Sequence, residues 1–190
     1  MSGSLTMYVL GPPSSGKTSL LNQIQSINND GCLLTRPSHD APTKGQVVHI
    51  LTLQSPENEN VYCTAELREL GGEMTSMWEK FIKGKINSAQ TSGRGRYALM
   101  FVVDALAPHM LPISSIMLAR LKGCDGVCRD WPLVVLLNKV VARNTLTEEE
   151  VRFFLLTPGL EGVRILSVDS WNGLGLADAM AWIRSVAFSD

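Results

Sequence analysis

Short apolar runs rich in valine, isoleucine and leucine recur along the chain, and longer amphipathic or polar segments separate them. Apolar runs of this length, bounded by turn residues, predict buried strands. The six predicted strands are residues 5–10, 47–53, 61–65, 97–103, 133–137 and 163–168. Because most of the intervening segments are long enough for a helix, the pattern predicts an α/β fold.

Three of the intervening or following segments predict helices. In two of them the apolar residues fall on one helical face, at Leu20, Leu21, Ile24 and Ile27 and again at Leu176, Met180, Ile183 and Ala187. The third has Thr147 at an N-cap position, with acidic residues in the first turn and Glu150 three residues after the threonine. We expect this short helix to end near Leu156, ahead of Pro158.

The spacing of the strands predicts how they pair. The second and third strands flank the polar, turn-rich residues 55–60, which is typical of an antiparallel pair. The later strands are separated by enough chain for helical crossovers, which parallel neighbours require. The sequence therefore predicts a mostly parallel sheet with one antiparallel edge.

Composition narrows the function without defining it. The 190 residues carry 17 Lys and Arg against 18 Asp and Glu, a net charge of −1, which argues against binding nucleic acid over a broad face. The length predicts a single domain covering residues 1–190, and no uncharged stretch is long and unbroken enough to span a bilayer. The four cysteines do not form paired CxxC units, so we expect ordinary thiols and no zinc. A cytoplasmic protein is the resulting expectation.

One segment, residues 83–96, is polar, basic and contains glycine. The sequence predicts a solvated flexible insertion there. Contact with an anionic lipid surface or an acidic partner is the alternative, because no aromatic residues are interleaved for nucleic acid.

The strongest motif lies between the first predicted strand and the first predicted helix. Residues 11–18, Gly-Pro-Pro-Ser-Ser-Gly-Lys-Thr, match the phosphate-loop pattern G-x4-G-K-[ST] in the strand–loop–helix context that it needs. Backbone N–H groups at the helix start, a lysine for the terminal phosphates and a hydroxyl for Mg²⁺ supply the chemistry. Because Pro12 and Pro13 have no N–H, the remaining loop residues must provide the cradle. The candidate phosphate-binding residues are Gly11, Ser14, Ser15, Gly16, Lys17, Thr18 and Ser19.

Taken with this loop, four further segments resemble the Arf-like small GTPases over about residues 5–187. The segments are Pro42-Thr43-Lys44-Gly45, Arg68-Glu69-Leu70-Gly71-Gly72-Glu73, Asn138-Lys139 and Ser167-Val168. Glu69 in place of the family's usual Asp, and Trp78 six residues beyond Gly72, are similar to one branch of the family rather than to its ordinary members. The resemblance implies a P-loop fold of six mostly parallel strands with about five helices, binding GTP or GDP with Mg²⁺.

The resemblance also implies a role for each matching residue. Lys17 would contact the β- and γ-phosphates, Gly72 would sense the γ-phosphate, and Thr43 would act in catalysis with Glu73. The metal residues would be Thr18, Thr43 and Glu69, the last through water, and the base would be held by Asn138, Lys139, Ser167 and Val168. Effector and regulatory proteins are the implied partners, in membrane or ciliary protein traffic.

The chain departs from the family at the base-reading motif, Asn-Lys-x-Asp, because Val141 stands where the carboxylate belongs. That carboxylate accepts two hydrogen bonds from guanine, so we expect its loss to weaken guanine preference by about 3–6 kcal/mol, or roughly 10²- to 10⁴-fold. Asp169 could approach the base instead, although a capping role is the commoner use of such a residue.

A second departure is Glu73, which occupies the position of the water-orienting glutamine. A carboxylate cannot donate a hydrogen bond to the γ-phosphate and repels it. We therefore expect intrinsic hydrolysis to be slow or absent.

The family's amphipathic N-terminal helix also has no counterpart in residues 1–4, so we expect peripheral membrane contact to need a partner or the basic residues 80–96.

Two alternatives to the nucleotide-dependent switch stay open. A degenerate scaffold that holds nucleotide permanently, or none, is favoured by Val141. An ATP-using P-loop kinase or ATPase, with Asp104 at the end of the fourth strand as its metal-binding acid, would not explain Thr43 and Gly72.

Overall fold

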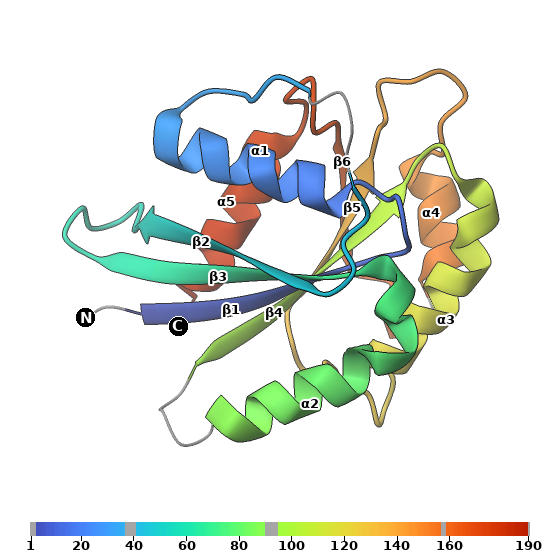
Figure 1. The fold of residues 1–190 in the computed structure, drawn as a ribbon, viewed down its shortest axis with the longest axis horizontal. Helices are drawn as coiled ribbons and strands as arrows, with labels where there is room; N and C mark the ends of the chain where they lie inside the picture. The colour runs from blue at the N-terminus through green and yellow to red at the C-terminus, as the bar shows by residue number, and fades with distance from the viewer. Residues whose placement is uncertain (1–2, 37–40, 90–94, 157–158, 190) are drawn as a thin grey trace.

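The computed structural model describes residues 3–36, 41–89, 95–156 and 159–189. One six-stranded sheet runs through them in the order β2-β3-β1-β4-β5-β6 (Figure 1). Its strands are β1 (Gly3–Leu10), β2 (Gln46–Gln54), β3 (Tyr62–Leu70), β4 (Arg96–Asp104), β5 (Leu133–Asn138) and β6 (Arg164–Val168). Each of the six predicted strands is confirmed, and most extend one or more residues beyond the apolar run.

The pairing is also as predicted. β2 and β3 form an antiparallel pair at one edge, and β1 pairs in parallel with β3 on one side and β4 on the other. β4, β5 and β6 continue the parallel sheet. Parallel strands place their carboxyl ends at a common edge, which is where ligands bind in sheets of this kind.

Helices cover both faces of the sheet (Figure 1). The α-helices are α1 (Lys17–Asp30), α2 (Trp78–Ala89), α3 (Leu111–Lys122), α4 (Glu148–Leu155) and α5 (Leu176–Ala187). Buried side chains of α1 and α5 form one apolar cluster with the sheet, and those of α2, α3 and α4 form a second on the opposite face. Covering both faces explains why the central strands are apolar almost throughout rather than alternating.

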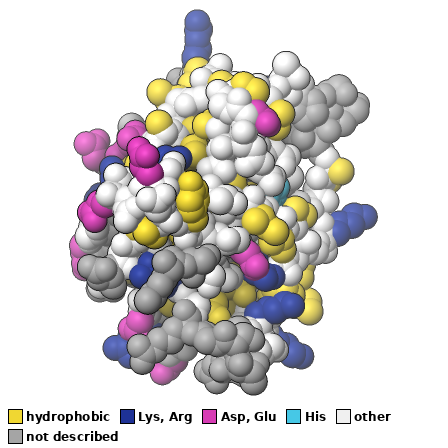
Figure 2. Space-filling view, turned by 90° about the vertical axis from the view of Figure 1, so that its left-hand side faces the viewer, with side chains coloured by type: hydrophobic (Ala, Val, Ile, Leu, Met, Phe, Trp, Pro, Cys, Tyr) yellow, Lys and Arg dark blue, Asp and Glu magenta, His cyan; other side chains and the backbone are white. Residues whose placement is uncertain are grey.

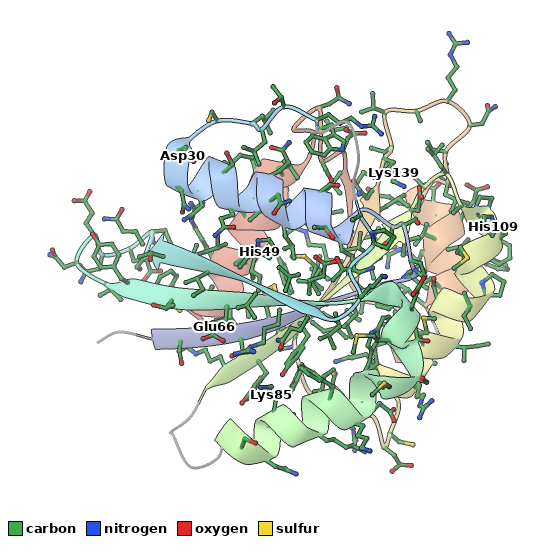
Figure 3. All side chains as sticks on the ribbon, in the orientation of Figure 1. Asp30, His49, Glu66, Lys85, His109 and Lys139 are labelled. Carbon is green, nitrogen blue, oxygen red and sulfur yellow. The ribbon has the colours of Figure 1, made fainter. Side chains whose placement is uncertain are left out.

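A few polar side chains lie inside these layers and fix how the elements sit. His49 of β2 lies next to α1, where its Nδ1 is 3.0 Å from Gln25 Oε1, and burial lowers its pKa (Figure 3).

On the end of the molecule turned to the viewer in Figure 2, hydrophobic side chains lie in separate groups between charged ones. Among the helices in the described part of the chain, none is long and apolar enough to cross a membrane.

The predicted insertion at residues 83–96 requires a correction, because its first half is helical. Residues 83–89 form the end of α2, with Ile82 buried and Ile86 packed on the same cluster. Lys83 and Lys85 are both exposed. The spacing of Trp78, Ile82 and Ile86 is helical, but the polar residues around them obscured it. Residues 90–94 lie outside the described part of the chain.

The capping of α4 is confirmed in full. Glu150 N–H donates to Thr147 Oγ1 at 3.2 Å, and Thr147 N–H donates to Glu150 Oε2 at 2.8 Å.

We expect Thr147→Ala to lower the free energy of unfolding by about 1 kcal/mol, because it removes one partner of this capping box. Urea unfolding measures the change. Thr145→Ala, the same truncation ahead of the helix, is the control, and an equal loss in both variants would contradict the assignment.

Candidate nucleotide site

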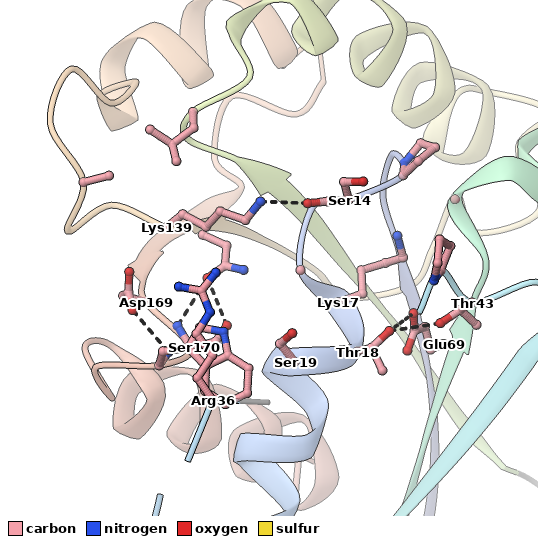
Figure 4. Close-up of a pocket in the computed structure, with 18 of the residues that line it drawn as sticks. Ser14, Lys17, Thr18, Ser19, Arg36, Thr43, Glu69, Lys139, Asp169 and Ser170 are labelled. Atoms are coloured by element: carbon pink, nitrogen blue, oxygen red, sulfur yellow. Dashed lines mark hydrogen bonds between the residues drawn. The ribbon is translucent and has the colours of Figure 1, made fainter. Parts of the chain in front are cut away.

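A cavity of about 550 Å³ opens where the carboxyl ends of the strands meet the start of α1 (Figure 4). Most of the predicted site residues meet there. Those that line it are Ser14, Gly16, Lys17, Thr18, Ser19, Thr43, Glu69, Gly72, Glu73, Asn138 and Lys139. Residues 14–19, 43, 69–73 and 138–139, which are far apart in the sequence, thus contribute to one site.

The loop between β1 and α1 takes a conformation that depends on its glycines. Gly16 has φ 86°, and a Cβ placed on it would lie 2.4 Å from Asn138 Nδ2. Ser14 also has a positive φ, of 61°, which is uncommon for a residue other than glycine. Ser15 is fully buried. Gly11 does not line the cavity, but its carbonyl oxygen accepts a hydrogen bond from Lys17 Nζ. The strained turn brings the backbone close to the space that a phosphate group would fill.

Lys17 is the first residue of α1, directly after this loop, and is 5 % exposed. Its Nζ donates to the carbonyl oxygens of Gly11 and Pro12, at 3.0 and 2.9 Å. Burial lowers the pKa of Lys17 to about 8, and the nearby Glu69 carboxylate opposes that shift. A buried cation of this kind is stabilised further by an anion in the cavity.

Three oxygen-bearing side chains converge beside the lysine. Thr18 Oγ1 donates to Glu69 Oε1 at 2.8 Å and lies 3.0 Å from Thr43 Oγ1 (Figure 4). Glu69 is 1 % exposed, and its Oε2 has no hydrogen-bond partner among the described residues. A buried carboxylate with an unsatisfied oxygen beside two hydroxyls fits a hard cation such as Mg²⁺, which prefers oxygen ligands and retains several waters.

The Gly71–Gly72 segment packs directly on the phosphate loop. A Cβ on Gly72 would lie 2.3 Å from Pro13 N, so only glycine fits at that approach. Gly71 N–H donates to Gly45 O at 2.9 Å, and Trp78 Nε1 donates to Gly71 O at 3.1 Å. Glu73, the next residue, is exposed at the rim of the cavity. The segments around Thr43 and Gly72 are therefore joined to each other as well as to the loop.

Asn138 and Lys139 tie the end of β5 to the same loop. Asn138 Nδ2 donates to Ser15 O at 3.0 Å, and its Oδ1 accepts from Ser170 Oγ at 3.0 Å. Lys139, which has φ 69°, donates from Nζ to Ser14 O at 2.8 Å and to Asp104 Oδ2 at 2.6 Å. Asp104 therefore holds this lysine in place.

Val141 also lines the cavity, with 54 % of its surface exposed. The position at which the base-reading carboxylate is missing therefore does face the site. An apolar side chain there offers no hydrogen-bond acceptor.

Ser167 and Val168 are not among the residues that line the cavity, and their contact with the base stays a prediction. Val168 is fully buried in the core, and Ser167 Oγ donates to Glu148 Oε1 at 2.8 Å. The reason is that β6 continues through Val168, so the loop at the cavity starts at Asp169. Asp169, Ser170, Trp171 and Asn172 line it instead.

Asp169 holds this loop in shape. Its Oδ1 accepts from Trp171 N at 3.1 Å, from Asn172 N at 3.0 Å and from Asn172 Nδ2 at 2.8 Å. This is a turn role rather than the helix-capping role that the sequence suggested, because α5 begins later, with Gly175 at its N-cap. Sequence reasoning missed Arg36 and Trp171, both of which line the cavity, because neither belongs to a motif.

The fold and the cavity together define a P-loop domain with the fold of a small GTPase. The solved structure of the Arl6 BBS3 small GTPase from Trypanosoma brucei with bound nucleotide analogue GppNp is similar, with a TM-score of 0.68 over 97 % of this chain and 97 % of that one. The two sequences are 20 % identical, so the likeness concerns the fold. No model of a known protein family and no curated protein matches the sequence.

Proposed function

We propose that this chain is an Arf-like GTP-binding switch that binds GTP or GDP with Mg²⁺. The observation that carries the proposal is the convergence of Thr18, Thr43 and Glu69 beside the buried Lys17, in a cavity formed by a phosphate loop. A cation and a polyphosphate would complement these groups in charge and in hydrogen bonding.

Each residue has a role in this proposal. Lys17 and the N–H groups of residues 14–19 would hold the phosphates, Gly11 would shape the loop, and Gly72, which packs on Pro13, would respond to the γ-phosphate. Thr18, Thr43 and Glu69 hold Mg²⁺, whose charge would offset that of the phosphates. At the base, Asn138 and Lys139 stay assigned, while the residues at 169–172 take the place of Ser167 and Val168.

The switch itself would be the Thr43 and Gly71–Glu73 segments. Gly71 N–H bonds to Gly45 O, so ordering of one segment by the γ-phosphate would stabilise the other. Trp78, bonded to Gly71 O, connects this change to α2. Effector and regulatory proteins that distinguish the two states are the expected partners.

The finer assignment rests on the sequence resemblance. The run at residues 68–72, with Glu69 and Trp78, is similar to the Arf-like protein 16 branch. We place the protein in the cytoplasm, with peripheral contact to an endomembrane or a cilium, and propose a part in membrane or ciliary protein traffic. This step is an analogy with the family.

Equilibrium titration of nucleotide-stripped protein tests the proposal. Fluorescent GTP, GDP and ATP are each titrated with and without Mg²⁺, and we expect GTP and GDP to bind at micromolar concentration or below and GTP to depend on Mg²⁺. Lack of binding by any nucleotide would contradict the proposal and favour the degenerate scaffold. Equal binding of ATP, which Val141 at the cavity favours, would leave the phosphate and Mg²⁺ site in place and remove guanine specificity from the proposal.

Hydrolysis is expected to be slow because of Glu73. We expect Glu73→Gln to raise the single-turnover rate of GTP hydrolysis by about fivefold, since it removes about 1 kcal/mol of repulsion at a solvent-exposed position and restores a donor. The control is Glu79→Gln, the same change at an ion pair with Arg120 outside the cavity. A rapid wild-type rate that Glu73→Gln leaves unchanged would contradict this assignment.

A further inference from the structure

The outer side of α4 carries two exposed phenylalanines. Phe153 is 80 % exposed and Phe154 is 58 % exposed, and their rings meet edge to face with centroids 4.9 Å apart. They are two of the five phenylalanines in the chain. A phenylalanine buries about 150–250 Å² when it is covered, so the pair approaches the few hundred Å² at which an exposed apolar patch marks a binding site.

The rotation of α4 is fixed, so the two rings are held at the surface. The inward side of the helix is taken by Val151 and Leu155, which are fully buried in the core on this face of the sheet. The capping box holds the first turn, and Arg152 Nη1 donates to Glu161 O at 2.9 Å and to Val163 O at 3.1 Å. Turning the helix to bury a phenylalanine would expose Val151 and break these bonds.

The surroundings of the two rings are acidic. From residue 145 to residue 163 the chain has four glutamates and one arginine, and neither lysine nor aspartate. Glu149 and Glu150 stand three to four residues before the rings, which places them on the same side of the helix. Glu150 belongs to the cap, while the Glu149 carboxylate forms no salt bridge within the described part of the chain. We call Glu149, Glu150, Phe153 and Phe154 the aromatic–acidic face.

The charge of this face decides what fits it. Its glutamates repel the anionic headgroups of a membrane surface, and they would be brought together if two copies of the chain packed through it. They attract lysine and arginine, which also bind over the faces of phenyl rings. A guanidinium paired with Glu149 would lie within reach of Phe153, one helical turn further along.

We propose that the aromatic–acidic face of α4 docks a basic segment of a partner protein, in which an arginine or lysine stands next to an apolar side chain. The apolar side chain packs on the two rings, and the cation pairs with Glu149. An aromatic centre with charged groups around it is the usual arrangement at protein interfaces.

This surface lies apart from the nucleotide cavity. Figure 1 shows α4 beside α3, at the β6 end of the sheet, and no residue of the aromatic–acidic face lines the cavity. The side-chain hydrogen bonds that hold α4 lead to Ser167, Glu161 and Val163 rather than to the segments around Thr43 and Gly72. We therefore expect the docked segment to bind the GDP and GTP forms equally well.

Three synthetic peptides of equal length, each with a fluorescent label, serve as probes in anisotropy titrations. The first alternates arginine with leucine, the second glutamate with leucine, and the third arginine with glycine. The second peptide keeps the apolar side chains without the positive charge, and the third keeps the charge without the apolar side chains. We expect the arginine–leucine peptide to bind about tenfold or more tightly than either of the others.

Two variants separate the contributions of ring and charge. We expect Phe153→Ser to weaken the arginine–leucine peptide by about 5- to 30-fold, and Glu149→Gln to weaken it by about two- to fivefold and to reduce its salt dependence. The matched controls are Ile116→Ser, at an apolar side chain 64 % exposed on α3, and Glu57→Gln, at an exposed carboxylate between β2 and β3. Thermal unfolding should be unchanged in both test variants, because neither side chain is buried.

Binding that is equal for the three peptides, or that Phe153→Ser weakens no more than Ile116→Ser does, would overturn the proposal. Cosedimentation with vesicles of phosphatidylcholine and phosphatidylserine that Phe153→Ser abolishes would overturn it in favour of a membrane. A dimer in analytical ultracentrifugation that the same variant dissociates would overturn it in favour of a second copy.

The proposed nucleotide binding is tested separately on the same preparations. If GDP binds and no peptide depends on Phe153, the docking surface is overturned and the nucleotide site stands. If the arginine–leucine peptide binds as expected and no nucleotide does, the docking surface stands without the switch.

Discussion

Val141→Asp is expected to raise the preference of the protein for GDP over ADP by about 10²- to 10⁴-fold, the largest change available from one substitution. Val141 lines the cavity and is 54 % exposed, so a carboxylate there needs no burial of charge in the core. It would accept two hydrogen bonds from guanine and would repel the acceptor on the corresponding edge of adenine.

Competition between GDP and ADP for the same fluorescent nucleotide measures this preference. Val141→Asn is the matched control, because asparagine has the same shape as aspartate but carries no charge and has only one acceptor oxygen. If Val141→Asp leaves the ratio of the two dissociation constants unchanged, position 141 does not face the base. The preference of the wild type would then depend on other residues at the cavity.

The sequence predicted the parts of this molecule that depend on local pattern. Apolar runs identified all six strands, and Thr147 with Glu150 identified the start of α4 because a capping box lies within four residues. The phosphate loop was predicted for the same reason: its glycines, lysine and threonine are adjacent in the chain. α2 was not predicted as a helix, since Ile82 and Ile86 stand among polar residues, and α3 was not predicted as a segment either.

The rest of the site depends on contacts between distant parts of the chain. The sequence did not indicate that residues 169–172 line the cavity, because the length of a strand depends on its neighbour and β6 pairs with β5 through Val168. Arg36 lines the cavity from the segment after α1, which Gln23 holds through two hydrogen bonds with Leu34. No motif in the sequence encodes those contacts, so only the structure places that residue.

Lys17→Ala is expected to weaken GTP and GDP binding by about 10²-fold or more, because it removes charge-assisted hydrogen bonds worth about 1.5–3 kcal/mol each. The loss is smaller than the full sum, since Lys17 must first release Gly11 O and Pro12 O. Lys83→Ala, an exposed lysine on α2, is the control. Equal affinities of the Lys17 and Lys83 variants would contradict the assignment.

Lys17 also predicts a pH dependence that the alanine variant should lack. Its pKa is about 8 in the free protein because burial disfavours the charge, and bound phosphate would raise it again. Binding above pH 8 therefore takes up a proton, so the affinity for GDP, measured in EDTA to exclude the metal, should fall by up to about tenfold per pH unit as the pH rises from 8 to 10. Below pH 8 the lysine is charged in both states, and its contribution should be constant. A wild-type affinity that does not change between pH 8 and 10, or one that changes equally in Lys17→Ala, would mean that this amine is not what holds the phosphates.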